Sequence, residues 1–139
     1  ILPTGLYGDP VLPSHLNHNP FIWLKRVIEG GNPRHEKIPN DSASMIHLRD
    51  LAKIFLAVYE NPNASGRYFG VYKSLHWYDI YNECRKLIPN MNMPITFSDK
   101  PVEPTGFDFT RRDSLKVHIR DFSTTLKETI NWLKTKPFE

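Results

Sequence analysis

The sequence has a single cysteine, Cys84, and no long apolar run. One cysteine excludes an internal disulfide framework and is typical of a reducing compartment, so we expect a cytoplasmic protein. The longest apolar stretch is far below the roughly 18 residues that a membrane span requires. No basic start followed by an apolar segment indicates a signal peptide. These absences predict a globular protein with no membrane partner.

Basic clusters and metal-ligand patterns are also scarce. The net charge is only +3, and the lysines and arginines are scattered along the chain, which predicts no nucleic-acid partner. Among six histidines, only His15 and His18 have an i, i+3 spacing, and no cysteine accompanies them. We therefore predict no metal site.

Twelve prolines, concentrated in three zones, predict short helices separated by extended connections. Apolar periodicity and capping residues predict the elements. We expect strands over residues 1–8, 45–47 and 67–72, and helices over 20–29, 49–59, 74–87 (capped by Ser74) and from Ser123 onward. The fold class is therefore α/β with few strands, and the sheet is expected to be incomplete. Because the sequence begins with Ile1-Leu2, in the middle of an apparent strand, we also expect a truncated chain.

Four short phrases occur in a fixed order. They are Pro3-Thr4-Gly5-Leu6-Tyr7-Gly8-Asp9-Pro10, Leu16-Asn17, Ile46-His47-Leu48-Arg49-Asp50-Leu51-Ala52 and Ala64-Ser65-Gly66-Arg67-Tyr68. Together they resemble the C-terminal part of an extended short-chain dehydrogenase/reductase, in the cinnamoyl-CoA reductase and dihydroflavonol reductase-like branch of the NAD-dependent epimerase/dehydratase superfamily. The glycine motif for dinucleotides and the catalytic Tyr-x-x-x-Lys pair of that family are absent from this chain.

The resemblance implies a domain organisation and a cofactor. It implies a C-terminal substrate-binding portion with the last strands of an incomplete Rossmann sheet. Residues 1–8 and 66–73 would be strands of the nucleotide-binding sheet, and residues 9–47 and 74–139 would form mainly the substrate-binding lobe. By position, Pro3, Thr4 and Leu6 would face the nicotinamide ring of NADP or NAD in a full-length parent. The choice between the two cofactors is made by residues after the second strand of a Rossmann domain, which this chain does not contain.

The same resemblance implies a small-molecule carbonyl substrate, namely an aldehyde, ketone or acyl-CoA. Four residues after the turn that Gly8-Asp9-Pro10 predicts are the candidates for the pocket wall: Leu12, Leu16, Asn17 and Phe21. No catalytic residue is assigned to this chain, because the tyrosine, lysine and serine of the family would lie upstream. We therefore expect a substrate-side fragment of an NAD(P)H-dependent carbonyl reductase that is inactive alone.

Two alternatives stay open. A nucleotide-sugar epimerase or dehydratase usually carries an arginine ahead of the His-x-x-Asp phrase, whereas Asp41-Ser42-Ala43-Ser44 has no base. The other alternative is a non-catalytic α/β module that forms a homodimer through an open sheet edge, at Arg67–Tyr72 or Leu2–Leu6, since an unpaired edge invites association.

Two further segments have competing interpretations. In the His-x-x-Asp phrase we expect a mainly architectural role, with a local hydrogen bond from His47, Asp50 at the helix start and an Arg49–Asp50 surface ion pair. Trp77, Tyr78 and Tyr81 could line an aromatic-substrate pocket, but the same spacing is typical of a helix facing the core.

Overall fold

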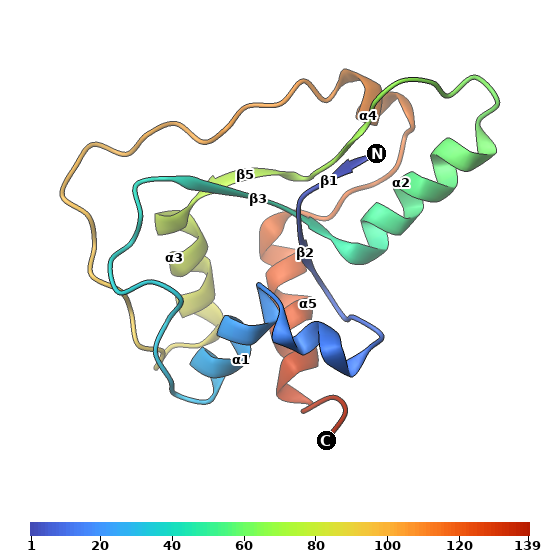
Figure 1. The fold of residues 1–139 in the computed structure, drawn as a ribbon. Helices are drawn as coiled ribbons and strands as arrows, with labels where there is room; N and C mark the ends of the chain where they lie inside the picture. The colour runs from blue at the N-terminus through green and yellow to red at the C-terminus, as the bar shows by residue number, and fades with distance from the viewer.

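The computed structural model describes residues 1–139, which form an α/β fold with two small sheets (Figure 1). The elements follow in chain order as β1 (Leu2–Pro3), β2 (Gly5–Tyr7), the 3₁₀ helix η1 (Pro13–Asn17), α1 (Phe21–Ile28), β3 (Ser42–His47), α2 (Leu48–Glu60), β4 (Phe69–Gly70), β5 (Lys73–His76), α3 (Trp77–Leu87), α4 (Thr110–Ser114) and α5 (Phe122–Lys134). None of these helices is both long enough and apolar enough to cross a membrane.

The sheets join segments that are far apart in the sequence. In the first, β1 pairs in parallel with β4, and in the second, β3 lies between β2 (parallel) and β5 (antiparallel). The connection from β1 to β4 runs through β2, η1, α1, β3 and α2. Neither β1 nor β4 has a second neighbour, which leaves this sheet open on both edges.

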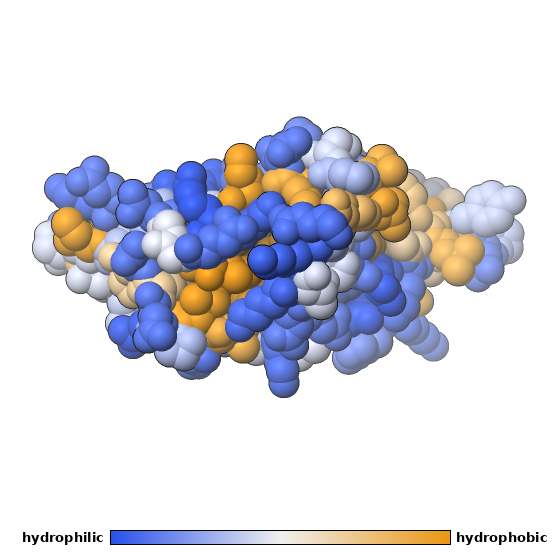
Figure 2. All heavy atoms as spheres, turned by 90° about the horizontal axis from the view of Figure 1, so that it is seen from below, coloured by the Kyte–Doolittle hydropathy of each residue, from blue (hydrophilic) through white to orange (hydrophobic).

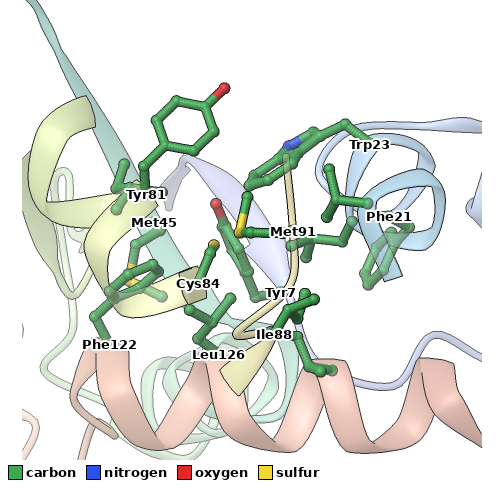
Figure 3. Packing of buried hydrophobic residues seen from close by; sticks show 14 of the residues in the cluster. Tyr7, Phe21, Trp23, Met45, Tyr81, Cys84, Ile88, Met91, Phe122 and Leu126 are labelled. Carbon is green, nitrogen blue, oxygen red and sulfur yellow. The ribbon is translucent and has the colours of Figure 1, made fainter. Parts of the chain in front are cut away.

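The main core lies where α1, α3 and α5 pack beside the three-stranded sheet (Figure 1). Apolar residues at helical spacing make this possible, as with Leu126, Ile130 and Leu133 on α5, which are all buried. Figure 3 shows Cys84 and Tyr7 side by side at the centre of the cluster. A smaller cluster of Ile46, Leu51 and Ile54 fixes α2.

Burial makes Cys84 a probe of the folded state. Desolvation raises the pKa of its thiol to about 12, so almost no reactive thiolate exists at neutral pH. We expect iodoacetamide to leave Cys84 unmodified in the native protein and to alkylate it fully in denaturant, as measured by intact mass. Rapid alkylation of the native protein would contradict the packing in Figure 3.

The helix starts differ from the expectations. Ser74 does not cap α3, because it lies buried within β5 and bonds Ser44, with 2.6 Å between their Oγ atoms. His76 caps α3 instead, its Nδ1 accepting from the backbone N–H of Tyr78. Asp121, and not Ser123, caps α5 by accepting from the N–H of Thr124. In each case the side chain of the residue directly before the first helical residue bonds a free N–H group.

Candidate functional site

The turn after β2 is held against two other elements. Gly8 has φ of +119°, and its N–H donates to Thr129 Oγ1 on α5 at 2.8 Å. A Cβ at Gly8 would lie 2.8 Å from Cε1 of His47 and 3.0 Å from Cγ of Leu48. Only glycine combines this conformation with this close approach. The position of β2 and of the residues before the turn therefore depends on contacts with α5 and the β3–α2 corner.

A pocket of about 450 Å³ opens between this strand and the segment that follows the turn. Ten residues line it: Thr4, Gly5, Leu6, Pro10, Val11, His15, His18, Asn19, Phe21 and Leu48. None of them is Asp, Glu, Lys or Arg, so the wall is apolar with a few neutral polar groups. The hydroxyl Oγ1 of Thr4 is buried without a hydrogen-bond partner.

The structure brings three of the seven candidate residues together in this pocket. Thr4, Leu6 and Phe21 line it. Pro3 lies outside, paired with Gly70 in the β1–β4 sheet. The other three also lie outside it: Leu12 is 52% exposed ahead of η1, Leu16 packs against the main core, and Asn17 is exposed at the end of η1. The roles suggested for all seven remain predictions.

Several lining residues were missed by sequence reasoning. His15, His18 and Asn19 face the pocket because residues 13–17 form a 3₁₀ helix, which was not predicted. The i, i+3 spacing of the two histidines was the signal available, since residues three apart lie on one side of a 3₁₀ helix. Leu48 reaches the pocket from the start of α2, through pairing of β2 with β3.

The His-x-x-Asp corner, residues 47–50 where β3 leads into α2, makes more long-range hydrogen bonds than expected. His47 does make the local bond that was predicted, accepting from the N–H of Arg49 at 3.1 Å. The expected Arg49–Asp50 pair is wrong, because Arg49 bonds Asp9 in the turn and Asp50 is fully buried. Asp50 accepts from both the backbone N–H and the guanidinium of Arg120, 70 residues away. The corner therefore ties the turn to the segment that leads into α5.

The ring of His47 also bonds Glu128 on α5, with 3.0 Å between Nε2 and Oε2. Since Nδ1 accepts from Arg49, we assign the ring proton to Nε2, where it donates to the carboxylate. Burial and the charge of Arg120 lower the pKa of His47, and the neutral ring is favoured. Burial likewise lowers the pKa of His35.

These lowered pKa values predict a stability change with pH. Both rings bind a proton less readily in the folded chain than in the unfolded chain, whose histidines titrate near pH 6.5, so the stabilisation is present above that pH and lost as the pH falls below it. We expect the free energy of unfolding to fall between pH 7 and pH 5.5, by at most about 1.4 kcal/mol per pH unit for each histidine. Urea titrations of the wild type and His47→Gln check this, and the variant should show a shallower dependence.

The aromatic residues of α3 mainly form the core. Trp77 and Tyr81 are buried, and the backbone N–H of His35 donates to the Tyr81 hydroxyl at 3.1 Å. Tyr78 is 43% exposed, and none of the three lines the pocket. Burial raises the pKa of Tyr81 to about 12, which keeps the phenol protonated. A structural role fits these positions.

A larger hollow of about 580 Å³ lies between β1, β4 and α4, away from this pocket. Two arginines line it, Arg67 and Arg111, and the second donates to the Ser65 carbonyl. It contains none of the candidate site residues, so we assign the site to the pocket beside β2.

Sequence comparison finds reductases among the relatives of this chain. No family model matches the chain. Cinnamoyl-CoA reductase CAD2 of Medicago truncatula is 30% identical over 140 residues, which are 99% of this chain and 41% of that protein. Dihydroflavonol 4-reductase of Dianthus caryophyllus is also 30% identical, over 60% of this chain and 25% of that protein. The chain is related to the C-terminal part of extended short-chain dehydrogenases/reductases of the cinnamoyl-CoA reductase and dihydroflavonol reductase branch.

Solved structures show the same extended short-chain dehydrogenase fold. The yeast methylglyoxal/isovaleraldehyde reductase Gre2, complexed with NADPH, superposes with a TM-score of 0.71 at 16% identity, over 96% of this chain and 45% of that one. UDP-glucose 4-epimerase of Thermotoga maritima superposes with a TM-score of 0.75 at 13% identity, with the same coverage. Likeness at this identity shows the fold alone, a C-terminal portion of an extended short-chain dehydrogenase with strands of an incomplete Rossmann sheet. The chain spans about two fifths of the length of its curated relatives.

Proposed function

We propose that this chain forms the substrate side of an NAD(P)H-dependent reductase of aldehydes, ketones or acyl-CoA thioesters. The observation that carries the proposal is the pocket beside β2, whose ten lining residues include no charged side chain. An uncharged, mostly apolar wall suits the body of a carbonyl compound. It offers no arginine or lysine to the diphosphate of a nucleotide sugar, a group that proteins bind with such bases.

The residues present fit a nicotinamide at one end of the pocket. Thr4 Oγ1 is a buried hydroxyl without a partner, and it can bond the amide of a bound ring. Gly5 is so close to the Ser44 carbonyl that a Cβ would lie 3.0 Å from it, which holds this strand in place. We propose that Thr4 and Leu6 hold the ring, with Pro3 stiffening the backbone before them. The bound cofactor would supply the hydride, and this chain would position the substrate and exclude water.

Side chains of β3 support the choice against a nucleotide-sugar substrate. Ser42 and Ser44 occupy the stretch where nucleotide-sugar epimerases and dehydratases usually carry an arginine. Their hydroxyls are already engaged, Ser44 with Ser74 and Ser42 with the N–H of Thr105 at 3.1 Å. Arg49, the nearest arginine along the chain, is held by Asp9.

A chimera tests the proposal. The part of cinnamoyl-CoA reductase CAD2 outside the match would be joined to Ile1 and assayed for NADPH oxidation with an aldehyde, a ketone, an acyl-CoA and UDP-glucose. We expect oxidation with at least one carbonyl compound, and we expect no turnover from the 139-residue chain alone. Thr4→Val should raise the KM for NADPH about fivefold, the worth of one hydrogen bond, whereas the exposed Thr96→Val should not. A folded chimera that acts on no carbonyl compound, or that epimerises UDP-glucose, contradicts the proposal.

One observation favours a second candidate, the self-associating module. Ala52, Phe55, Leu56 and Tyr59 form an exposed stripe along α2, and the last three are 53%, 54% and 88% exposed. Phe55 points away from the core, since Leu51 and Ile54 cover the core side of α2. Figure 2 shows apolar residues reaching the surface among hydrophilic ones. An uncovered apolar stripe along a helix is typical of an interface.

The stripe predicts association of the isolated chain. We expect light scattering coupled to size exclusion to show dimers or larger species, and Phe55→Asp with Tyr59→Asp to shift the protein toward the monomer. Tyr78→Asp, at an exposed position on α3, is the matched control and should change nothing. A wild-type chain that stays monomeric at high concentration would rule out this candidate.

A further inference from the structure

His15 and His18 line the proposed substrate pocket, and their rings form no hydrogen bond or ion pair with the rest of the chain. Resting on the proposed function, we propose that His15 and His18 select the substrate by hydrogen-bonding an oxygen that lies away from its reacting carbonyl. The substrate class is then a carbonyl compound whose part inside this pocket is uncharged, mostly apolar and carries a second oxygen, such as a hydroxyl.

The local backbone places both rings together. Residues 13–17 form a 3₁₀ helix, and the N–H of His18 donates to the His15 carbonyl at 3.1 Å. His15 lies on this helix and His18 follows its last residue, and both line the pocket. Asn19 follows directly and lines the same pocket, so three polar side chains meet at this wall.

Hydrogen bonding distinguishes these two histidines from three others in the chain. Three histidines elsewhere have structural bonds: His35 with the Tyr81 hydroxyl at 2.9 Å, His47 with Glu128, and His76 with Asn40 at 2.9 Å. The rings of His15 and His18 have no hydrogen bond or ion pair in the chain. These rings therefore stabilise no other element through hydrogen bonds, and their nitrogen atoms are free to bond a ligand.

The rest of the wall defines what the ligand must offer. Leu6, Pro10, Phe21 and Leu48 present apolar surface, and no charged group is present to pair with an anion. An imidazole can donate to or accept from a hydroxyl, so an oxygen-bearing ligand satisfies it. A site built to bond a hydroxyl discriminates against an analogue without it, because its own polar groups are then left unpaired. The predicted selectivity is therefore for an oxygen over a methyl group of similar size.

The isolated 139-residue protein can test this directly. The probes are para-hydroxyacetophenone and para-methylacetophenone, which differ only in a hydroxyl or a methyl group. Carbon–proton NMR spectra of the histidine rings and methyl groups are recorded during titration with each probe. We expect the ring signals of His15 and His18 to shift with the hydroxyl probe, with a Kd about fivefold lower than for the methyl probe. The ring signals of His35 and His76 should stay in place.

Histidine variants distinguish selection of the hydroxyl group from binding of the apolar part of the probe. His15→Phe with His18→Phe should bind the two probes with equal Kd, while His118→Phe, at an exposed position outside the pocket, should keep the fivefold preference. Equal Kd for both probes with shifts at Leu6 and Thr4 overturns the inference but leaves the proposed function standing. No shift of any pocket signal also overturns it, and the chimera assay then decides separately whether the reductase proposal survives.

Discussion

Replacing Asp50 with alanine is expected to lower the free energy of unfolding by about 3–5 kcal/mol. The carboxylate is fully buried, and one of its oxygens accepts from the backbone N–H of Arg120 at 2.8 Å. The other oxygen bonds the Arg120 guanidinium, whose side chain is 22% exposed. Alanine would leave the backbone N–H of Arg120 without a partner, and the partly buried guanidinium would keep only its ion pair with Glu128. Removal of one member of such a pair costs more than the pair itself contributes.

Urea unfolding of Asp50→Ala and of a control measures this effect. Asp113→Ala removes a carboxylate that is 65% exposed in its ion pair with Arg112, so it should cost no more than about 1 kcal/mol. Asp50→Asn keeps the shape and can still accept from the N–H of Arg120, and its cost should fall between the two. Equal losses for Asp50→Ala and Asp113→Ala would show that the buried pair does not hold α5 to the corner.

Replacing Gly8 with alanine is expected to cost roughly 2–4 kcal/mol, the sum of overpacking and a disfavoured backbone conformation. The new Cβ would lie 2.8 Å from Cε1 of His47, a ring fixed by bonds to Arg49 and Glu128. The ring cannot retreat without breaking those bonds, so we expect the turn to move instead. The bond from the Gly8 N–H to Thr129 should then weaken, and the pocket wall at Leu6 should shift.

Gly30→Ala is the matched control for this substitution. Gly30 also has a positive φ, +85°, but a Cβ there meets nothing within 4 Å. It should therefore cost only the conformational part, about 1–2 kcal/mol. The difference between the two variants in urea unfolding isolates the collision with His47. If both lose the same free energy, the close approach of the turn to the corner is not maintained in solution.

Local patterns were sufficient to predict most helices but few of their contacts. The apolar spacing in residues 20–29 and after Ser123 predicts α1 and α5 because a helix buries one face whatever its neighbours are. The caps were less predictable, since Ser74, His76, Ser123 and Asp121 all suit a helix start. Which of them caps depends on where the strand or loop before it ends, and pairing of β5 with β3 decided this for α3.

The sequence by itself determined the family resemblance, the α/β class and the turn at Gly8, because ordered phrases and glycine or proline positions act over short distances. Only the tertiary structure showed that Asp50 meets Arg120 across 70 residues, that His47 packs on Gly8, and that His15 and His18 line one pocket with Thr4. Contacts between distant segments depend on strand register and helix packing, which no single segment encodes. The candidate site belongs to this second group, since its residues come from β2, η1, α1, α2 and the loops between them.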